Sequence, residues 1–344
     1  MTLRVTEDNP LPEGIISGYL TAKKGLKLRY ALLSREEPGP GTVVLLQGRC
    51  EAIEKYFETI GDLRAMGFDC ATLDWRGQGG SDRMLRDRMA AHVRSFDHYV
   101  EDLTLFFNEV VLQSCRPPYF ILAHSMGGLV TLLALPQLAQ HVRRAVLLAP
   151  LLGLNEAIDQ KWIGKIASLL CGLGLGSRYF PQTRHRGRLT AFEGNRVTSD
   201  RRRFERNRAI ELTFPELTVG RPTAAWVQAA CDAIKRVHET GFMAANRTPL
   251  LLVAAGSDAM ISNDAIEDYA RRIRSGHCLV VDGARHELLQ ESDIYREQAL
   301  AAFRAFVTGR MTSEEPGEAE TIEPERTETA KPDENGERSE PGVT

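Results

Sequence analysis

The stretch ILAHSMGGLV, residues 121–130, places a serine between two apolar segments. The residues before it predict a short buried strand, and those after it predict the apolar side of a helix. Ala123, Gly127 and Gly128 are small enough to let the two backbones approach closely in a tight turn. Such a turn exposes Ser125 at its apex and points the first backbone N–H groups of the helix towards it.

This arrangement is typical of a nucleophile elbow, written G-x-S-x-G, with Ala123 at the first glycine position and His124 before the serine. A serine held in this way can act as the nucleophile of a hydrolase. An ordinary strand-to-helix turn capped by a serine has the same local pattern. The nucleophile hypothesis therefore needs a base and an acid elsewhere in the chain.

A serine nucleophile is activated by a histidine that a carboxylate orients, and at an elbow of this type the chain order is serine, acid, histidine. His286 follows the last predicted strand, in VVDGARHELLQES, and Asp258 follows the strand before it, in LLVAAGSDAMIS. Asp264 and Asp282 are rival acids, but one begins a predicted helix and the other precedes the histidine loop. The sequence therefore predicts a catalytic triad of Ser125, Asp258 and His286.

The oxyanion of acyl transfer needs two backbone N–H donors. One is predicted to be the N–H of Met126, directly after the serine. The other is expected just after the apolar strand at 42–47, where Gly48 lets the loop approach a substrate and Arg49 can donate. A plain glycine turn after a strand is the alternative interpretation of this second loop.

Apolar and amphipathic segments alternate through most of the chain, which is typical of a mostly parallel, doubly wound α/β sheet with helices on both faces. Residues 19–21 and 27–33 predict an antiparallel hairpin before the parallel part. Parallel strands are expected at 42–47, 68–75, 119–122, 144–148, 249–255 and 278–281.

The alternation stops between residues 151 and 235. We expect this segment to be a helical cap, inserted at the carboxyl edge of the sheet where folds of this type bind ligands. The α/β core would then consist of residues 1–150 and 236–308.

Charge is unevenly distributed. The whole chain carries −3, whereas residues 311–344 hold 11 acidic against 3 basic residues and so carry −8, which leaves about +5 for residues 1–310. The C-terminal segment has almost no apolar residues, and it cannot bury enough surface to offset the entropy cost of ordering. Residues 309–344 are therefore predicted to be a disordered acidic tail.

The six cysteines are scattered, so neither a zinc site nor a disulfide framework is predicted. The N-terminus lacks the apolar run of a signal peptide, and no apolar stretch is long enough to span a bilayer. We expect a cytoplasmic protein that can contact a membrane surface peripherally and that needs no metal or organic cofactor.

Five stretches resemble α/β-hydrolases of the lysophospholipase and monoacylglycerol lipase type, especially bacterial lysophospholipase L2-like proteins. They are LLQGRCEAIEKYFETIGDL, LDWRGQGGSDR, LAHSMGG, SDRRRFERN with PELTVGRPTAAW, and DGARHELLQESD, and they span roughly residues 15–307. Gln47 stands where many hydrolases have histidine, and Ala123 replaces the elbow glycine. The L2-like group resembles this chain at both positions.

The resemblance implies an α/β-hydrolase fold and the same three triad residues. It also implies a lysophospholipid or monoacylglycerol as substrate and an acyl-enzyme intermediate. A generic carboxylesterase and a serine aminopeptidase of the S33 type remain alternatives, and a non-catalytic binding protein is a further one.

An arginine cluster lies within the predicted cap, with ten arginines against three acidic residues between 178 and 208. Arg201, Arg202 and Arg203 are expected to attract a phosphate headgroup or an anionic membrane surface. A solvated helix face is the alternative. No aromatic–basic interleaving accompanies the cluster, so nucleic acid is not an expected partner.

Overall fold

The computed structural model describes residues 3–155, 160–181, 191–309 and 342–343. The predicted acidic tail lies almost wholly outside these residues. One sheet has the strand order β1-β2-β4-β3-β5-β6-β7-β8. Its strands are β1 Ile15–Thr21, β2 Lys27–Leu33, β3 Thr42–Leu46, β4 Asp69–Leu73, β5 Tyr119–His124, β6 Val142–Leu148, β7 Leu250–Ala255 and β8 Gly276–Val281.

Strand β2 runs antiparallel to both β1 and β4, whereas the pairs from β4 through to β8 are parallel. The predicted hairpin and the mostly parallel sheet are therefore confirmed. The predicted strand at 119–122 continues to His124, because Ala123 and His124 still pair with Leu147 and Leu148 of β6. This extension brings the end of β5 directly to Ser125.

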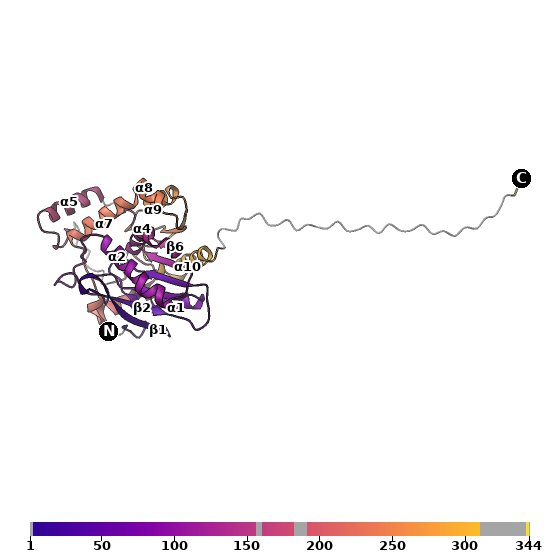
Figure 1. Ribbon diagram of the computed structural model, residues 1–344, viewed down its shortest axis with the longest axis horizontal. Coiled ribbons are helices and arrows are strands. Elements are labelled where there is room, and N and C mark those ends of the chain that lie inside the picture. Colours follow the sequence, from indigo (N-terminus) through magenta and orange to yellow (C-terminus); the bar gives the residue numbers. More distant parts are fainter. Residues whose placement is uncertain (1–2, 156–159, 182–190, 310–341, 344) are drawn as a thin grey trace.

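Helices cover both faces of the sheet (Figure 1). The helices are α1 Phe57–Ala65, α2 Asp97–Phe106, α3 Leu112–Ser114, α4 Met126–Leu138, α5 Gln160–Gly172, α6 Arg201–Thr213, α7 Ala224–Val237, α8 Thr240–Ala245, α9 Asn263–Arg272 and α10 Asp293–Val307. Alternate residues of a strand point to opposite faces. Val44 and Leu46 of β3 accordingly pack in the core beneath α2, α4 and α9, while Val43 and Leu45 pack in the core beneath α1 and α10.

The chain between β6 and β7 supplies α5, α6, α7 and α8, and its described residues add no strand to the sheet. Helix α7 packs on α4 of the sheet layer, and α5 packs on α7. Helix α5 consequently lies at the outer margin of the molecule (Figure 1). Among the described helices, none has both the length and the apolar character needed to cross a bilayer.

Candidate active site

Ser125 occupies a strained turn between β5 and α4. Its backbone has φ 49° and ψ −112°, a left-handed conformation that a residue with a side chain rarely adopts. The Ser125 N–H donates to the carbonyl oxygen of Leu148 (2.9 Å), which holds the turn against β6. A Cβ atom on Gly127 would lie 2.6 Å from the Gln47 carbonyl oxygen, so only glycine allows α4 to start this close to β3. Strain of this kind often marks a functional residue.

The structure brings Ser125, His286 and Asp258 together. Nε2 of His286 lies 3.1 Å from the Ser125 hydroxyl oxygen, and Nδ1 lies 2.7 Å from Oδ2 of Asp258. The other oxygen of Asp258 accepts hydrogen bonds from the backbone N–H groups of Met260 (2.7 Å) and Ile261 (3.0 Å). All three side chains of the relay are buried.

Two effects act in opposite directions on the Asp258 carboxyl. Burial alone would raise its pKa, but the hydrogen bond and charge of His286, together with the two backbone N–H donors, lower it below its ordinary value. The carboxylate therefore remains ionised. It can orient the His286 ring and stabilise the imidazolium that forms when the ring accepts a proton.

The rival acids are placed differently. Asp264 lies in the first turn of α9 and Asp282 follows β8, and both are exposed. Within the described part of the chain, the carboxylate that meets the His286 ring is that of Asp258.

The two N–H groups predicted to act as oxyanion donors belong to the segments that follow β5 and β3. Met126 is the first residue of α4, and Arg49 follows β3, which pairs in parallel with β5. In the described residues neither N–H has a hydrogen-bond acceptor. Gln78 links the two loops, because its Oε1 accepts from Cys50 N–H (2.6 Å) and its Nε2 lies 3.8 Å from the Met126 sulfur. The sequence contains no signal that would have identified Gln78.

A buried carboxylate, Glu51, ties the Arg49 loop to the elbow. It accepts from the N–H of Gly48 and from the hydroxyl of Tyr56 (2.6 Å), and its Oε2 lies 3.3 Å from Nδ1 of His124. Nε2 of His124 in turn faces the backbone carbonyl oxygen of His286 (3.1 Å). A Cβ atom on Gly48 would lie 2.8 Å from Nδ1 of His124, so this packing requires glycine.

Charge stabilises this network. Burial alone would raise the pKa of Glu51, but Lys55 and His124 outweigh it and lower that pKa well below its ordinary value. Burial would lower the pKa of His124, but the Glu51 carboxylate outweighs it and raises that pKa. Lys55 bridges Glu51 (2.7 Å) and Glu287 (2.8 Å). The network was not predicted, although Glu51 follows Gly48 by three residues in the loop already singled out.

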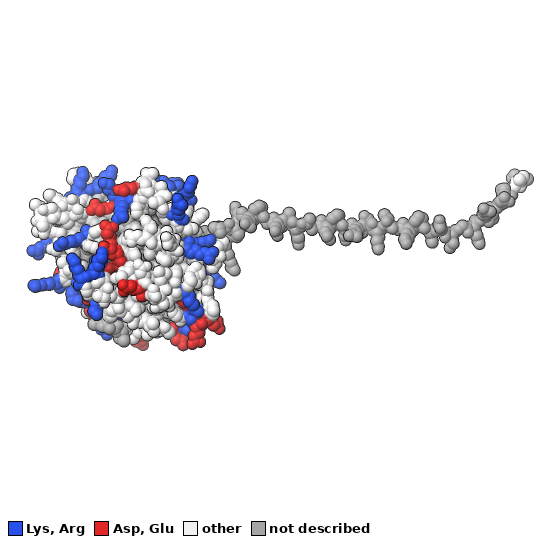
Figure 2. All heavy atoms as spheres, in the orientation of Figure 1, with Lys and Arg blue, Asp and Glu red and all other residues white. Residues whose placement is uncertain are grey.

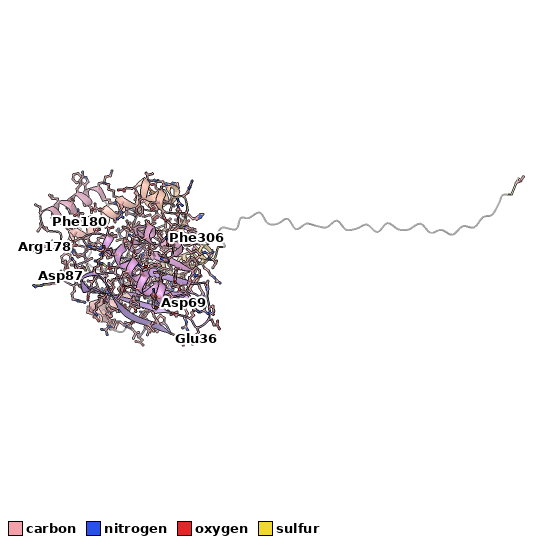
Figure 3. The ribbon with its side chains drawn as sticks, viewed as in Figure 1. Glu36, Asp69, Asp87, Arg178, Phe180 and Phe306 are labelled. Carbon is pink, nitrogen blue, oxygen red and sulfur yellow. The ribbon has the colours of Figure 1, made fainter. Side chains whose placement is uncertain are left out.

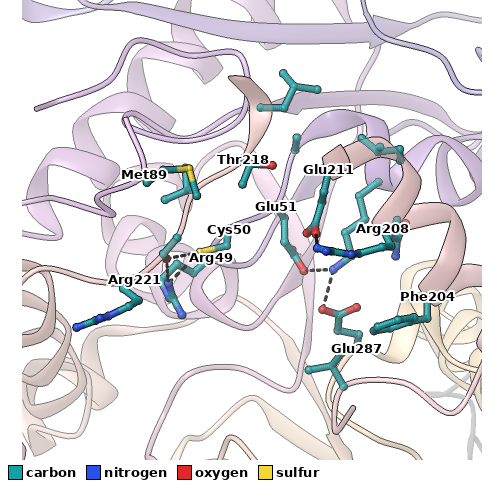
Figure 4. A pocket seen from close by; sticks show the side chains of 18 of the residues that line it. Arg49, Cys50, Glu51, Met89, Phe204, Arg208, Glu211, Thr218, Arg221 and Glu287 are labelled. Atoms are coloured by element: carbon teal, nitrogen blue, oxygen red, sulfur yellow. Dashed lines mark hydrogen bonds and ion pairs between the residues drawn. The ribbon is translucent and has the colours of Figure 1, made fainter. Parts of the chain in front are cut away.

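A cavity of about 660 Å³ adjoins this network (Figure 4). Glu51 and Glu287 lie in its wall, whereas Ser125 is not among the described residues that line it. The guanidinium of Arg49 donates to the Gly220 carbonyl oxygen (3.1 Å) and stacks 5.3 Å from the Trp226 ring centroid. The other lining side chains include the basic Lys55, Arg208 and Arg221 and the apolar Phe204 and Leu217. They also include the acidic Glu211, whose Oε2 lies 3.5 Å from Nη1 of Arg208.

The three arginines singled out in the sequence lie outside this cavity. Arg203 is buried, with its guanidinium between the carboxylates of Glu58 (2.6 Å) and Asp293 (2.7 Å). Arg201 and Arg202 are exposed and pair with acidic neighbours. A count of arginines in the sequence could not reveal these partners, since Glu58 and Asp293 are distant in the chain. Arg203 therefore anchors α6 to the core and is not available to a headgroup.

Known proteins resemble this chain over most of its length. A family described as serine aminopeptidase, S33 matches residues 38–293. Lysophospholipase L2 of Escherichia coli K12 is 32% identical over 278 residues, which cover 77% of this chain and 79% of that protein. A probable lysophospholipase L2 of Haemophilus influenzae is 28% identical over 302 residues, or 87% of this chain and 94% of that protein.

Solved structures share the fold. A soluble variant of monoglyceride lipase from Saccharomyces cerevisiae matches with a TM-score of 0.68 and 18% identity, covering 86% of this chain and 96% of that one. A carboxyl esterase from Bacillus coagulans gives the same TM-score at 15% identity, covering 86% and 98%. The predicted α/β-hydrolase fold and the resemblance noted in the sequence are both confirmed, and the chain belongs to the serine aminopeptidase S33 family.

Proposed function

We propose that the protein is a serine hydrolase that cleaves carboxylic esters of the lysophospholipid or monoacylglycerol class. The observation that carries this proposal is the continuous hydrogen-bonded relay from Asp258 through His286 to the hydroxyl of Ser125 on a strained elbow. The N–H of Met126, directly after Ser125, and the N–H of Arg49, in the loop after β3, have no acceptor in the described residues and are the proposed oxyanion donors.

The reaction proceeds in two halves. As Oγ of Ser125 attacks the ester carbonyl carbon, its proton passes to Nε2 of His286, and Asp258 stabilises the resulting imidazolium. The N–H groups of Met126 and Arg49 donate to the oxyanion, a contribution of about 3 kcal/mol for one donor in related sites. His286 then gives its proton to the departing alcohol, and an acyl group remains on Ser125. In the second half a water molecule, deprotonated by His286, releases the acid.

The substrate class is supported by the names of the relatives and by the cavity beside Arg49. Arg208 and Arg221 reach this cavity from α6 and from the loop before α7. Guanidinium groups bind phosphate by charge-assisted hydrogen bonds. The cavity therefore accommodates the phosphate of a lysophospholipid leaving group, and the headgroup site comprises these two arginines in place of Arg203. Contact with an anionic membrane surface belongs to the same proposal, because such substrates reside there.

A substrate panel tests this proposal. Lysophosphatidylglycerol, monoacylglycerol, p-nitrophenyl butyrate and aminoacyl anilides are compared on the wild type and on Ser125→Ala. We expect turnover of the esters by the wild type alone, with the highest kcat/KM on lysophospholipid. Preferential cleavage of anilides would instead identify an aminopeptidase, and equal turnover by Ser125→Ala would refute the serine mechanism.

Arg208→Gln sharpens the headgroup assignment, with Arg202→Gln as its matched control on the same helix. The first variant should raise KM for lysophosphatidylglycerol about tenfold and leave p-nitrophenyl butyrate unchanged. The second should affect neither substrate. A rise in KM for both substrates would mean that Arg208 maintains the shape of the site and does not bind phosphate.

A further inference from the structure

The outward side of α5 carries a row of large apolar side chains. Trp162, Ile166, Leu169 and Leu173 follow one another at spacings of four, three and four residues, which places them on one helix face. The N–H of Leu173 donates to the carbonyl oxygen of Leu169 (3.0 Å), so the helical path reaches the fourth member. We call these four residues the α5 outer face.

This face is exposed although the helix is already packed. The inward residues Ile163, Ala167 and Leu170 belong to the core that α5 shares with α7. On the other side, Leu169 is 64% exposed and Leu173 is 66% exposed. A helix on the surface of a globular protein normally buries its apolar side and exposes a polar one. A second, exposed apolar side forms a patch of the kind that marks a contact site.

The exposed apolar residues are concentrated at this place. Of the sixteen large apolar side chains that are exposed in the described residues, six lie between 162 and 179. Of the other ten, Met84 and Met89 lie in the loop whose Asp87 contacts Tyr179, and the rest lie in other parts of the chain. Exposed apolar side chains that lie singly are normal for a folded protein. The α5 outer face is therefore a local feature and not a general property of the surface.

Positive charge accompanies this face. Residues 160–181 include Lys161, Lys165 and Arg178 and no acidic residue. Nζ of Lys165 lies 4.9 Å from the ring centroid of Trp162, and both Lys165 and Arg178 are exposed. Figure 2 shows basic side chains and uncharged surface along the margin that carries α5, with a few acidic side chains further inward.

The segment after α5 is fixed to the body on the same margin. The Tyr179 hydroxyl donates to Asp87 (2.5 Å), and the Phe180 N–H donates to the Pro222 carbonyl oxygen (3.0 Å). Figure 3 shows Asp87, Arg178 and Phe180 at this edge of the molecule. Hydrogen bonds to the body therefore hold the segment that follows the apolar row in place.

We propose that the α5 outer face docks on an anionic phospholipid surface. The proposal rests on the proposed function, since a hydrolase of lipid esters meets its substrate at such a surface. Aliphatic side chains and a tryptophan with adjacent lysines, and no acidic residue, match a helix that lies in the plane of a membrane interface. Negatively charged headgroups attract the basic residues, and the apolar row inserts at the boundary between the headgroups and the acyl chains. Docking there also brings α7, on which Arg49 rests through Trp226, towards the lipid.

Sedimentation with vesicles tests the proposal directly on the full chain. Vesicles of phosphatidylcholine alone are compared with a mixture of phosphatidylcholine and phosphatidylglycerol. We expect binding to the mixed vesicles, weaker binding to the neutral ones, and loss of binding as salt is added. Trp162 provides a second readout, because Trp75 and Trp226 are buried and a blue shift of emission on vesicle addition reports the exposed indole.

Paired variants decide whether α5 is responsible. Leu169→Asp with Leu173→Asp should weaken vesicle binding at least about tenfold, and Lys165→Gln about fivefold. Leu212→Asp on α6 is the matched control, since Leu212 is 65% exposed but lies outside this face, and it should bind as the wild type does. All these variants should retain turnover of p-nitrophenyl butyrate and the wild-type melting temperature.

The outcomes separate this inference from the proposed function. The docking proposal is overturned if the wild-type protein turns over esters but does not bind mixed vesicles. It is also overturned if the double variant binds them as strongly as the wild type does. Vesicle binding without any ester turnover overturns the proposed function alone. A dimer that the double variant dissociates, with no vesicle binding, would assign the face to a second copy of the chain and so refute the lipid surface.

Discussion

Two of the charged groups in the described part of the chain, the α6 anchor and the relay at Ser125, differ in how their charges are compensated. In the α6 anchor, Arg203 and Arg206 meet the carboxylates of Glu58, Asp200 and Asp293 at 2.5 to 3.0 Å. In the relay, a single carboxylate, Asp258, holds His286, and the chain of hydrogen bonds ends on the Ser125 hydroxyl.

This difference indicates that the α6 anchor is structural and that the relay can react. Every guanidinium nitrogen of Arg203 has a partner, and a buried ion pair of this kind holds segments together because breaking it leaves buried charge less well compensated. The relay instead ends on the hydroxyl of Ser125, a residue with positive φ, and the N–H of the next residue, Met126, has no acceptor in the described residues. Damage to the anchor should therefore reduce stability, and damage to the relay should reduce rate.

The largest expected effect comes from His286→Ala. Removing the base should lower kcat for p-nitrophenyl butyrate on the order of 10⁴-fold or more, as in other serine hydrolases. The melting temperature should change little, because the serine hydroxyl can still bond to water. Stopped assays at high enzyme concentration measure the residual rate. A rate within tenfold of the wild type would remove His286 from the chemistry.

Breaking the anchor should give the opposite result. Arg203→Met removes the guanidinium that Glu58 and Asp293 share, while Glu58 keeps Arg206 and Asp293 faces solvent, so we expect a loss of roughly 1.5–3 kcal/mol in the free energy of unfolding. The kcat of the molecules that remain folded should be preserved. Urea denaturation and active-site titration measure the two quantities.

Arg202→Met is the control for that experiment, because Arg202 pairs with the same carboxylate from a 71% exposed position at 3.6 Å. Its effect should lie within about 0.5 kcal/mol, as for most surface substitutions. Equal losses from Arg202→Met and Arg203→Met would contradict the distinction between a satisfied anchor and a solvated face.

Glu51→Gln sharpens the comparison, because Glu51 touches both the Arg49 loop and His124. The amide is similar in size but cannot neutralise Lys55 and His124. We expect kcat to fall about 10- to 100-fold through misplacement of the N–H donors and of His286. KM for p-nitrophenyl butyrate should stay nearly constant. A lower melting temperature with an unchanged kcat would show that the role of Glu51 is only structural.

The smallest effect is the acid dependence of the anchor. Burial would raise the pKa of Glu58, but hydrogen bonds from Arg203 and Arg206 outweigh it and lower that pKa from 4.5 to about 2. The stabilisation from Glu58 is therefore complete above the unfolded value and is lost as the pH falls from about 4.5 towards 2. Urea midpoints across this range should depend less steeply on pH in Glu58→Gln than in the wild type. Parallel slopes would show that Glu58 contributes no linked proton.

The sequence predicted the sheet and the grouping of the relay for reasons that can be traced to single residues. Buried parallel strands are continuously apolar, and their carboxyl ends meet at one edge, so residues just after them are neighbours in space. Ser125 follows β5, Asp258 follows β7 and His286 follows β8, each within a few residues of its strand end. The catalytic roles of these residues remain a prediction.

Other parts of the site were not predictable, because they depend on pairings between distant residues. Arg203 was assigned to lipid headgroups, yet its partner Glu58 lies 145 positions earlier in α1. The exposed face of α5 was not predictable either, because periodicity alone cannot show which side of a helix stays uncovered. His124 was only a spacer in the elbow motif, although its Nε2 contacts the backbone of His286.

The most direct test of the account is to identify the residue that becomes covalently modified. The wild-type chain is treated with a fluorophosphonate probe, digested and analysed by tandem mass spectrometry, with Ser125→Ala in parallel. We expect one adduct, on Ser125, that blocks turnover of p-nitrophenyl butyrate, and no labelling of the variant. An adduct on a different residue, or undiminished labelling of Ser125→Ala, would contradict it.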